Sequence, residues 1–170
     1  MKKRDVQRYG GRLRMIVPDA FFVLILLFSD QFTKQLAVAR LKGTGAVSLI
    51  PGVMELIYVE NTGMAFGLLK GGRIIFLGIC MIFLPFLWWF HSKIPSEKRF
   101  LPLRICLILI TAGALGNAMD RLLRGYVVDF FQTVFIDFPV FNLADCYVVV
   151  GAFLLVFLML FVYKEGELHE

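Results

Sequence analysis

Four long apolar runs limit what this chain can fold into. A helix needs about 20 mostly apolar residues to cross a bilayer, and each run is close to that length. Of the 170 residues, 59% are hydrophobic, more than the near half that soluble domains average. The sequence therefore predicts a single integral membrane domain over residues 1–170, with spans at about 19–39, 73–90, 101–120 and 141–163.

The positive charge is unevenly distributed along the chain, and this predicts the orientation. Six basic residues precede the first run and four more separate the second run from the third: Lys2, Lys3, Arg4, Arg8, Arg12 and Arg14, then Lys93, Lys98, Arg99 and Arg104. Cytoplasmic loops are enriched in Lys and Arg, so we expect both chain termini in the cytoplasm. The same bias accounts for the net charge of +5 without a nucleic-acid partner.

The segment between the first two runs is too short and too polar to cross a membrane. Residues 53, 55, 57 and 59 form one alternating set and residues 54, 56, 58 and 60 the other, as on the two faces of a strand. Pro51-Gly52 marks a turn before them. Alternation next to a turn is typical of a β-hairpin. We therefore predict a small β segment at about 43–66 on the outer surface. The segment contains Asn61, and glycines follow it. A re-entrant turn would explain the glycines but not the Asn.

The first run contains an acid and a base. Asp30 and Lys34 are four residues apart, so they share a helix face. Each ionisable group costs ~2.5–3.5 kcal/mol at the centre of a bilayer, so both should face the protein interior. They also interrupt an otherwise signal-like run before the small residues 37–39, so we predict a retained helix. A structural salt bridge and a supporting role near a functional site both stay open.

The third run ends, and the fourth begins, with an Asn followed three residues later by an Asp. These are Asn117 with Asp120, and Asn142 with Asp145. Because one helix ends where the next begins, both carboxylates are expected at one membrane face. Two carboxylates that share a proton supply the base and the acid for peptide hydrolysis. We predict Asp120 and Asp145 as a catalytic pair, with the amides orienting the carboxylates or a substrate carbonyl; simple cap or interface residues are the alternative.

Other catalytic chemistries lack the residues that they need. There is no HExxH zinc motif, and His91 and His169 are expected at the inner end, where His91 would be a solvated end residue. The three cysteines have no CxxC spacing, so we expect no metal, no disulfide and no cofactor. The nucleophile candidates Ser29 and Cys146 have no histidine near them, and only Lys34 stays open as a base.

Five short stretches, in order between the four apolar runs, match one protein family. They are DQFTK at 30–34, NTGMAF at 61–66, GALGNAMDR at 113–121, VDF at 128–130 and FNLAD at 141–145. Through them the chain resembles the lipoprotein signal peptidases (signal peptidase II), which are bacterial membrane aspartic peptidases. The resemblance extends over nearly the whole length. Cys146 departs from it, because the family more often has a serine there.

The resemblance implies an all-α polytopic membrane fold, with four transmembrane helices and a small extracytoplasmic β-cradle. It implies that Asp120 and Asp145 are the catalytic dyad. It also implies the substrate: a prolipoprotein whose lipobox cysteine carries diacylglycerol, cut on the N-terminal side of that cysteine. Further binding-site positions would be Asp30, Asn61, Gly113, Asn117, Arg121, Asp129 and Asn142.

These expectations place the protein in the bacterial cytoplasmic (inner) membrane, as a monomer among membrane lipids, with the active site near the outer face. Two other functions stay open. A small proton- or ion-coupled transporter would use Asp30, Lys34, Asp120 and Asp145 as relay groups. It would also need polar residues across the inner halves of the helices, and the second and fourth runs lack them. A non-enzymatic membrane scaffold would tolerate Asp120→Asn.

Overall fold

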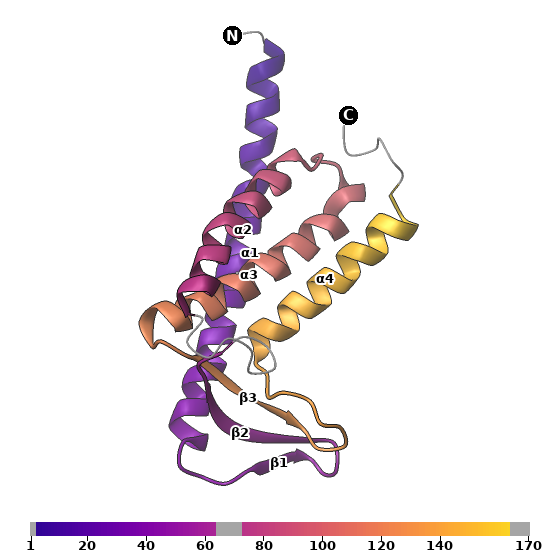
Figure 1. Cartoon of the computed structure of the whole chain (residues 1–170). Helices are drawn as coiled ribbons and strands as arrows, with labels where there is room; N and C mark the ends of the chain where they lie inside the picture. Colours follow the sequence, from indigo (N-terminus) through magenta and orange to yellow (C-terminus); the bar gives the residue numbers. More distant parts are fainter. Residues whose placement is uncertain (1–2, 64–72, 164–170) are drawn as a thin grey trace.

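The computed structural model describes residues 3–63 and 73–163, with side chains from residue 16 onward. Four helices form an elongated bundle, and three strands form a sheet at one end of it (Figure 1). Each of these helices is long and apolar enough to cross a membrane, which confirms the predicted fold class. The helices are α1 (Lys3–Leu41), α2 (Arg73–Lys93), α3 (Leu101–Leu123) and α4 (Leu143–Phe161), with the 3-10 turn η2 (Lys98–Phe100) before α3.

The helix ends differ from the ends of the apolar runs. α1 begins at Lys3 rather than near residue 19, and it continues through Pro18. Hydropathy marks only the part of a helix that suits the bilayer, so polar turns at the ends escape it. α3 continues one turn beyond Asp120 to Leu123, so Asp120 lies inside the helix. α4 is two residues shorter at each end than the predicted span of 141–163.

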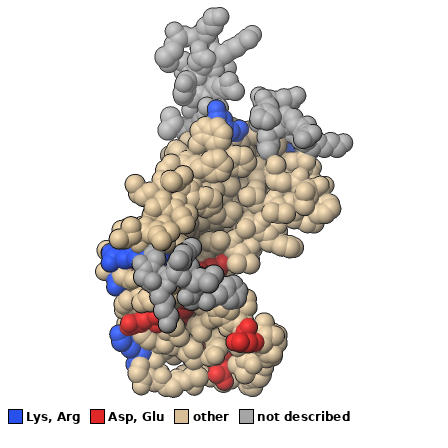
Figure 2. All heavy atoms as spheres, in the orientation of Figure 1, with Lys and Arg blue, Asp and Glu red and all other residues tan. Residues whose placement is uncertain are grey.

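α3 is the central helix of the bundle. The other three helices each pack against it, and 61% of the α3 span is buried, against 11% of each of the other spans. The exposed faces of α1, α2 and α4 carry large apolar side chains such as Phe28, Ile82 and Phe153. Figure 2 shows this part of the surface almost free of charged side chains, which gather toward the two ends. A surface of this kind suits lipid hydrocarbon.

The sheet is antiparallel with strand order β1-β2-β3. The predicted hairpin at about 43–66 is present as β1 (Val47–Ile50) and β2 (Met54–Asn61), while residues 64–66 lie outside the described part of the chain. The third strand, β3 (Val127–Thr133), was not predicted. It pairs with β2 from Met54 opposite Thr133 to Asn61 opposite Val127. Its partner strand lies more than 60 residues earlier, so the β-branched and aromatic residues of β3 were its only local signal.

Glycines let the helices approach closely where the polar residues lie. A Cβ atom at Gly113 would collide with the Ala144 carbonyl oxygen at the start of α4. A Cβ atom at Gly116 would lie 2.5 Å from the Asp30 Oδ2 atom on α1. The close approach predicted from these two glycines is therefore present, and α3 touches α1 and α4 at the sheet end of the bundle.

Candidate active site

A buried polar cluster lies at the sheet end of the bundle, between α1, α3, α4 and β3. Seven of the predicted site residues there have side chains with at most 8% exposure: Asp30, Lys34, Asn117, Asp120, Arg121, Asp129 and Asn142. Asn61 and Asp145 are half-buried beside them. Buried polar groups need partners, so the pattern of hydrogen bonds determines what each one can do.

Lys34 is fixed at the centre of this cluster. Its Nζ atom lies 2.9 Å from Asp30 Oδ2 and 3.1 Å from Asp120 Oδ2, and it donates to Asn117 Oδ1 at 3.0 Å. An ammonium has three donors and no acceptor, so all of its hydrogen-bonding capacity is used. Lys34 is therefore both a structural ion-pair partner and a support of the cluster, and it is not a free base for a serine or cysteine nucleophile.

Asp30 ties α1 to the beginning of α4. Its Oδ1 atom accepts a hydrogen bond from the Ala144 backbone N–H at 3.0 Å, while Oδ2 receives Lys34 and, at 3.1 Å, Gln31 Nε2. Gln31 was not predicted as a site residue, although it lies inside the DQFTK stretch. Its Nε2 atom also lies 3.3 Å from Asp120 Oδ1, so it links the two carboxylates.

Asp120 is surrounded by cations and donors. Its Oδ1 atom lies 3.0 Å from an Arg124 Nη1 atom, and its Oδ2 atom lies 3.1 Å from Lys34. Oδ2 also accepts the Val128 backbone N–H at 3.2 Å, and the residue is 1% exposed. Each of the two oxygen atoms therefore has a cation against it. Arg124 was not predicted to take part, and its only sequence signal is its position four residues after Asp120 on α3.

Asp145 has neutral partners. Its Oδ1 atom accepts a hydrogen bond from Asn117 Nδ2 at 2.7 Å, and its Oδ2 atom accepts the Asn142 backbone N–H at 3.0 Å. The Asn142 side chain in turn accepts the Asp145 N–H at 3.0 Å, which completes a capping box at the start of α4. We expected Asn117 beside Asp120 on its own helix. Instead it bonds across to α4, because Lys34 directs the amide oxygen and leaves the N–H₂ group facing Asp145.

Asp129 is the second carboxylate that accepts hydrogen bonds from neutral side chains. Its two oxygen atoms accept hydrogen bonds from Asn142 Nδ2 at 2.6 Å and from Asn61 Nδ2 at 2.9 Å. No ion pair to it occurs within the part of the chain that the structure describes. Burial raises the pKa of Asp129 to about 6, and the negative charge of Asp145 adds to this effect, against the lowering by its amide donors. Asn142 thus touches both Asp129 and Asp145.

Arg121 joins this cluster to α2 and to the end of β2. Its Nη2 atom donates to the Gly63 carbonyl oxygen at 2.9 Å, and its guanidinium carbon lies 3.9 Å from the centroid of the Phe76 ring. The Asn61 side chain accepts the Gly63 N–H at 3.0 Å. The rest of the NTGMAF stretch, residues 64–66, lies outside the described residues. Gly113 contributes no polar atom and serves the close approach of α3 and α4.

His91 belongs to a separate cluster at the end of the bundle far from the sheet. The expectation that it is a solvated end residue was wrong. Its Nε2 atom lies 2.9 Å from Asp19 Oδ2, and its side chain is only 12% exposed. Arg104 binds the same carboxylate through Nε at 2.8 Å and Nη2 at 2.6 Å. The hydropathy pattern did not reveal this ion cluster because its members come from three helices. His169 lies outside the described residues.

Comparisons with known proteins give the family. A family model described as signal peptidase (SPase) II matches residues 22–161. The chain belongs to the lipoprotein signal peptidase family. The lipoprotein signal peptidase of Streptococcus thermophilus (strain CNRZ 1066) is 36% identical to it over 156 residues, which cover 92% of this chain and 99% of that protein. That of Caldanaerobacter subterraneus subsp. tengcongensis is 41% identical over 140 residues, covering 82% and 93%.

A solved structure agrees with the family. A bacterial membrane enzyme determined by the in meso method at 2.3 Å resolution is 32% identical, with a TM-score of 0.77 over 90% of this chain and 95% of that chain. The chain is therefore a signal peptidase II, an aspartic-type hydrolase of the membrane that removes signal peptides from prolipoproteins. This confirms the enzyme class predicted from the sequence and leaves no support for the transporter or the scaffold.

Proposed function

We propose that this peptidase cuts diacylglyceryl-modified prolipoproteins on the N-terminal side of the lipidated cysteine, with Asp129 and Asp145 as its catalytic pair. This pair replaces the pair Asp120 and Asp145 that we predicted from the sequence. One observation carries the change. Among the residues that the structure describes, Asp129 and Asp145 bond only to neutral amides and share Asn142, whereas Asp120 is paired with two cations.

The surroundings of Asp120 argue against a role in proton transfer. A catalytic carboxylate needs an oxygen atom that can reach water or substrate, and Lys34 and Arg124 already lie against the two oxygen atoms of Asp120. Its oxygen atoms are also occupied by donors, and the side chain is 1% exposed. We assign Asp120 a positioning role, because it holds Lys34 on one side and the Val128 N–H, directly before Asp129, on the other.

The pair of Asp129 and Asp145 suits a shared proton. Like charges close together resist double ionisation, and the raised pKa of Asp129, about 6, fits the member that holds the proton. Asp145 lies in the first turn of α4, where the helix dipole favours negative charge. It is also the half-buried member, which water and substrate can reach. We therefore assign Asp145 as the base and Asp129 as the acid.

The reaction then follows with balanced protons. Asp145 takes a proton from a water molecule while the water oxygen attacks the scissile carbonyl carbon. At the same time Asp129 gives its proton to the carbonyl oxygen. The resulting tetrahedral diol collapses when the C–N bond breaks. The proton on Asp145 passes to the leaving nitrogen atom, and a diol hydroxyl returns a proton to Asp129. The products are the carboxylate of the signal peptide and the free amino group of the lipidated cysteine.

We also propose the orientation in the membrane. The beginning of α1 and the end of α4 lie together at the end away from the sheet (Figure 1). The exposed cations Lys93 and Lys98 lie near that end, as expected of the cytoplasmic side. The catalytic cluster then lies near the outer face of the inner membrane, where a lipid-anchored substrate keeps its acyl chains in hydrocarbon while water reaches the peptide. We propose that the enzyme acts as a monomer.

Mass spectrometry of the cleavage products tests the substrate and the cut site. We expect the peptidase in nanodiscs to convert a diacylglyceryl-modified prolipoprotein into a product that begins with the modified cysteine. The same prolipoprotein without diacylglycerol is the matched control and should stay uncut. Equal cleavage of both forms, or a product that begins at another residue, would contradict the proposed specificity.

A further inference from the structure

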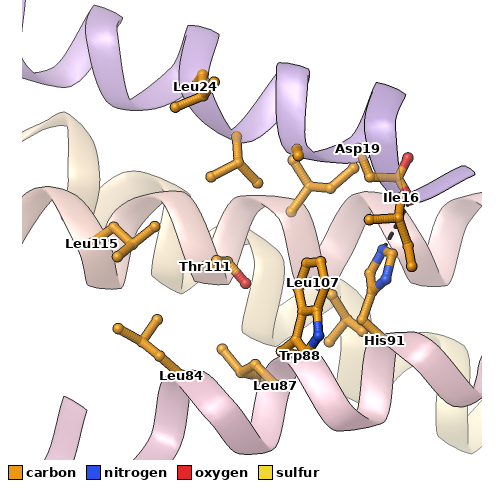
Figure 3. A pocket seen from close by; sticks show the side chains of 13 residues that line it. Ile16, Asp19, Leu24, Leu84, Leu87, Trp88, His91, Leu107, Thr111 and Leu115 are labelled. Carbon is orange, nitrogen blue, oxygen red and sulfur yellow. Dashed lines mark ion pairs between the residues drawn. The ribbon is translucent and has the colours of Figure 1, made fainter. Parts of the chain in front are cut away.

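A cavity of about 350 Å³ lies between α1 and α2, with α3 behind it, at the end of the bundle far from the sheet (Figure 3). Its walls are apolar and come from all three helices, among them Ala20, Leu24, Leu84, Leu107 and Leu115. It does not belong to the catalytic cluster. Its polar end at Asp19 lies 11 residues before Asp30 on α1, which is ~16 Å along the helix.

The size of the cavity limits what it can hold. It extends along α3 from Leu107 to Leu115, which is ~12 Å of helix. An extended hydrocarbon chain can lie along a space of this length, between the apolar side chains of the three helices.

One end of the cavity is polar and the other is not. His91 Nε2 lies 2.9 Å from Asp19 Oδ2 at this end, and the Trp88 ring stacks on the His91 ring with centroids 6.4 Å apart. Trp88 is 56% exposed, and its indole N–H has no hydrogen-bond acceptor among the described residues. Lys93 lies one turn beyond, with Nζ 5.7 Å from the Trp89 ring centroid. Lys93 does not line the cavity, but its cation and the Trp88 N–H lie at the same end of α2, where they complement the phosphate and ester groups of a phospholipid.

We propose that this cavity binds one acyl chain of a bilayer phospholipid, with the headgroup beside Trp88 and Lys93. The lipid comes from the leaflet at the end far from the sheet. The acyl chain fills the space between α1 and α2, which both pack on α3, and so buries apolar surface that would otherwise line an empty cavity. The lipid is thus part of the packed bundle and is independent of the peptide that is cut.

Native mass spectrometry of the full-length peptidase tests this proposal, with dioleoyl phosphatidylglycerol as the probe. Ala20→Phe fills the cavity from α1, and Leu84→Phe fills it from α2, so the test survives if one variant fails to fold. Ala152→Phe adds the same side chain on the exposed face of α4 and is the matched control. We expect one retained phospholipid in the wild type and in Ala152→Phe, and at least a fivefold smaller bound fraction in the two cavity variants.

The headgroup contacts give a second readout. Trp88→Phe combined with Lys93→Gln should remove the preference for phosphatidylglycerol over a diacylglycerol with the same acyl chains. Absence of bound lipid in the wild type, or equal retention in Ala20→Phe and Ala152→Phe, would overturn the proposal. Displacement of the phospholipid by a diacylglyceryl-modified peptide would also overturn it, because the cavity would then hold the substrate's chain. None of these readouts depends on peptide cleavage.

Discussion

The two ends of the bundle each bury charged side chains, but they use them differently. At the end far from the sheet, the Asp19 carboxylate accepts hydrogen bonds from Arg104 Nε and Nη2 and also contacts His91. At the sheet end, Asp120 is neutralised by Lys34 and Arg124 in the same way, but the partners of Asp129 and Asp145 within the described part of the chain are all amides. Carboxylates matched by cations join the helices. Carboxylates held by amides have no cation bound to them, which leaves them available for the proton transfers of hydrolysis.

Removing the cation at the far end should have the largest effect on stability. Arg104→Met leaves Asp19 without its main counter-ion, and breaking a buried ion pair in this way costs about 3–5 kcal/mol. Thermal unfolding in detergent should show the loss, while cleavage by the folded fraction stays near the wild-type rate. The double variant with Asp19→Asn is the control and should recover part of the stability. A loss below about 1 kcal/mol in Arg104→Met would contradict the comparison.

Protonation of Asp129 distinguishes the sheet end from the far end. Infrared titration should show a protonated carboxyl group with a midpoint at about pH 6. The Asp145 charge raises this pKa, so Asp145→Asn should move the midpoint to lower pH. The band should vanish in Asp129→Asn and remain in Asp120→Asn. A band that vanishes in Asp120→Asn and remains in Asp129→Asn would reverse our assignment.

The same pKa shift makes stability depend on pH. Between about pH 4 and pH 6 the folded protein holds a proton on Asp129 that the unfolded chain has lost, so the free energy of unfolding falls as pH rises through this window. The shift from 3.8 to about 6 corresponds to up to about 3 kcal/mol. Asp129→Asn should remove this contribution. Chemical unfolding at both ends of this pH window measures the contribution. If the free energy of unfolding changed equally with pH in the wild type and in Asp129→Asn, the burial of an ionisable Asp129 would be contradicted.

Variants of Asn142 test whether its contacts with Asp129 and Asp145 serve catalysis as well as the capping of α4. Asn142→Ala removes the N-cap of α4 and should cost about 1–2 kcal/mol. Asn142→Ser is the matched variant, because serine caps a helix but cannot also donate to Asp129. Thermal unfolding should show recovery in Asn142→Ser, while cleavage rates stay low in both variants. Recovery of cleavage together with stability would mean that the cap alone matters.

Arg124 should have the smallest effect. It pairs with Asp120 four residues earlier on α3, and its side chain is 19% exposed. Arg124→Gln should therefore cost less than about 1 kcal/mol. Arg124→Lys keeps the charge and should lie between this variant and the wild type in thermal unfolding. A loss from Arg124→Gln as large as that from Arg104→Met would show that the sheet end depends on full charge matching as much as the far end does.

The sequence predicted the features that depend on neighbouring residues. Hydropathy located all four helices, and alternation located β1 and β2. Neither pattern predicted β3, because its partner strand is distant in sequence. Asp129 was included only through the family resemblance. The partner of Asn117 also depends on the packing of α3 against α4, which no spacing encodes. The sequence did not predict the cluster of Asp19, His91 and Arg104, because each residue alone is typical of a helix end.

Cleavage and stability of three single variants test the central claim most directly. Asp129→Asn, Asp145→Asn and Asp120→Asn should be compared on a diacylglyceryl-modified prolipoprotein in nanodiscs, each beside its thermal unfolding midpoint. We predict that the first two lower cleavage by about 10³-fold or more. Asp129→Asn should unfold no earlier than the wild type, whereas any loss of cleavage in Asp120→Asn should come with a lower midpoint. If Asp129→Asn keeps more than about a tenth of the wild-type rate, the proposed pair is wrong.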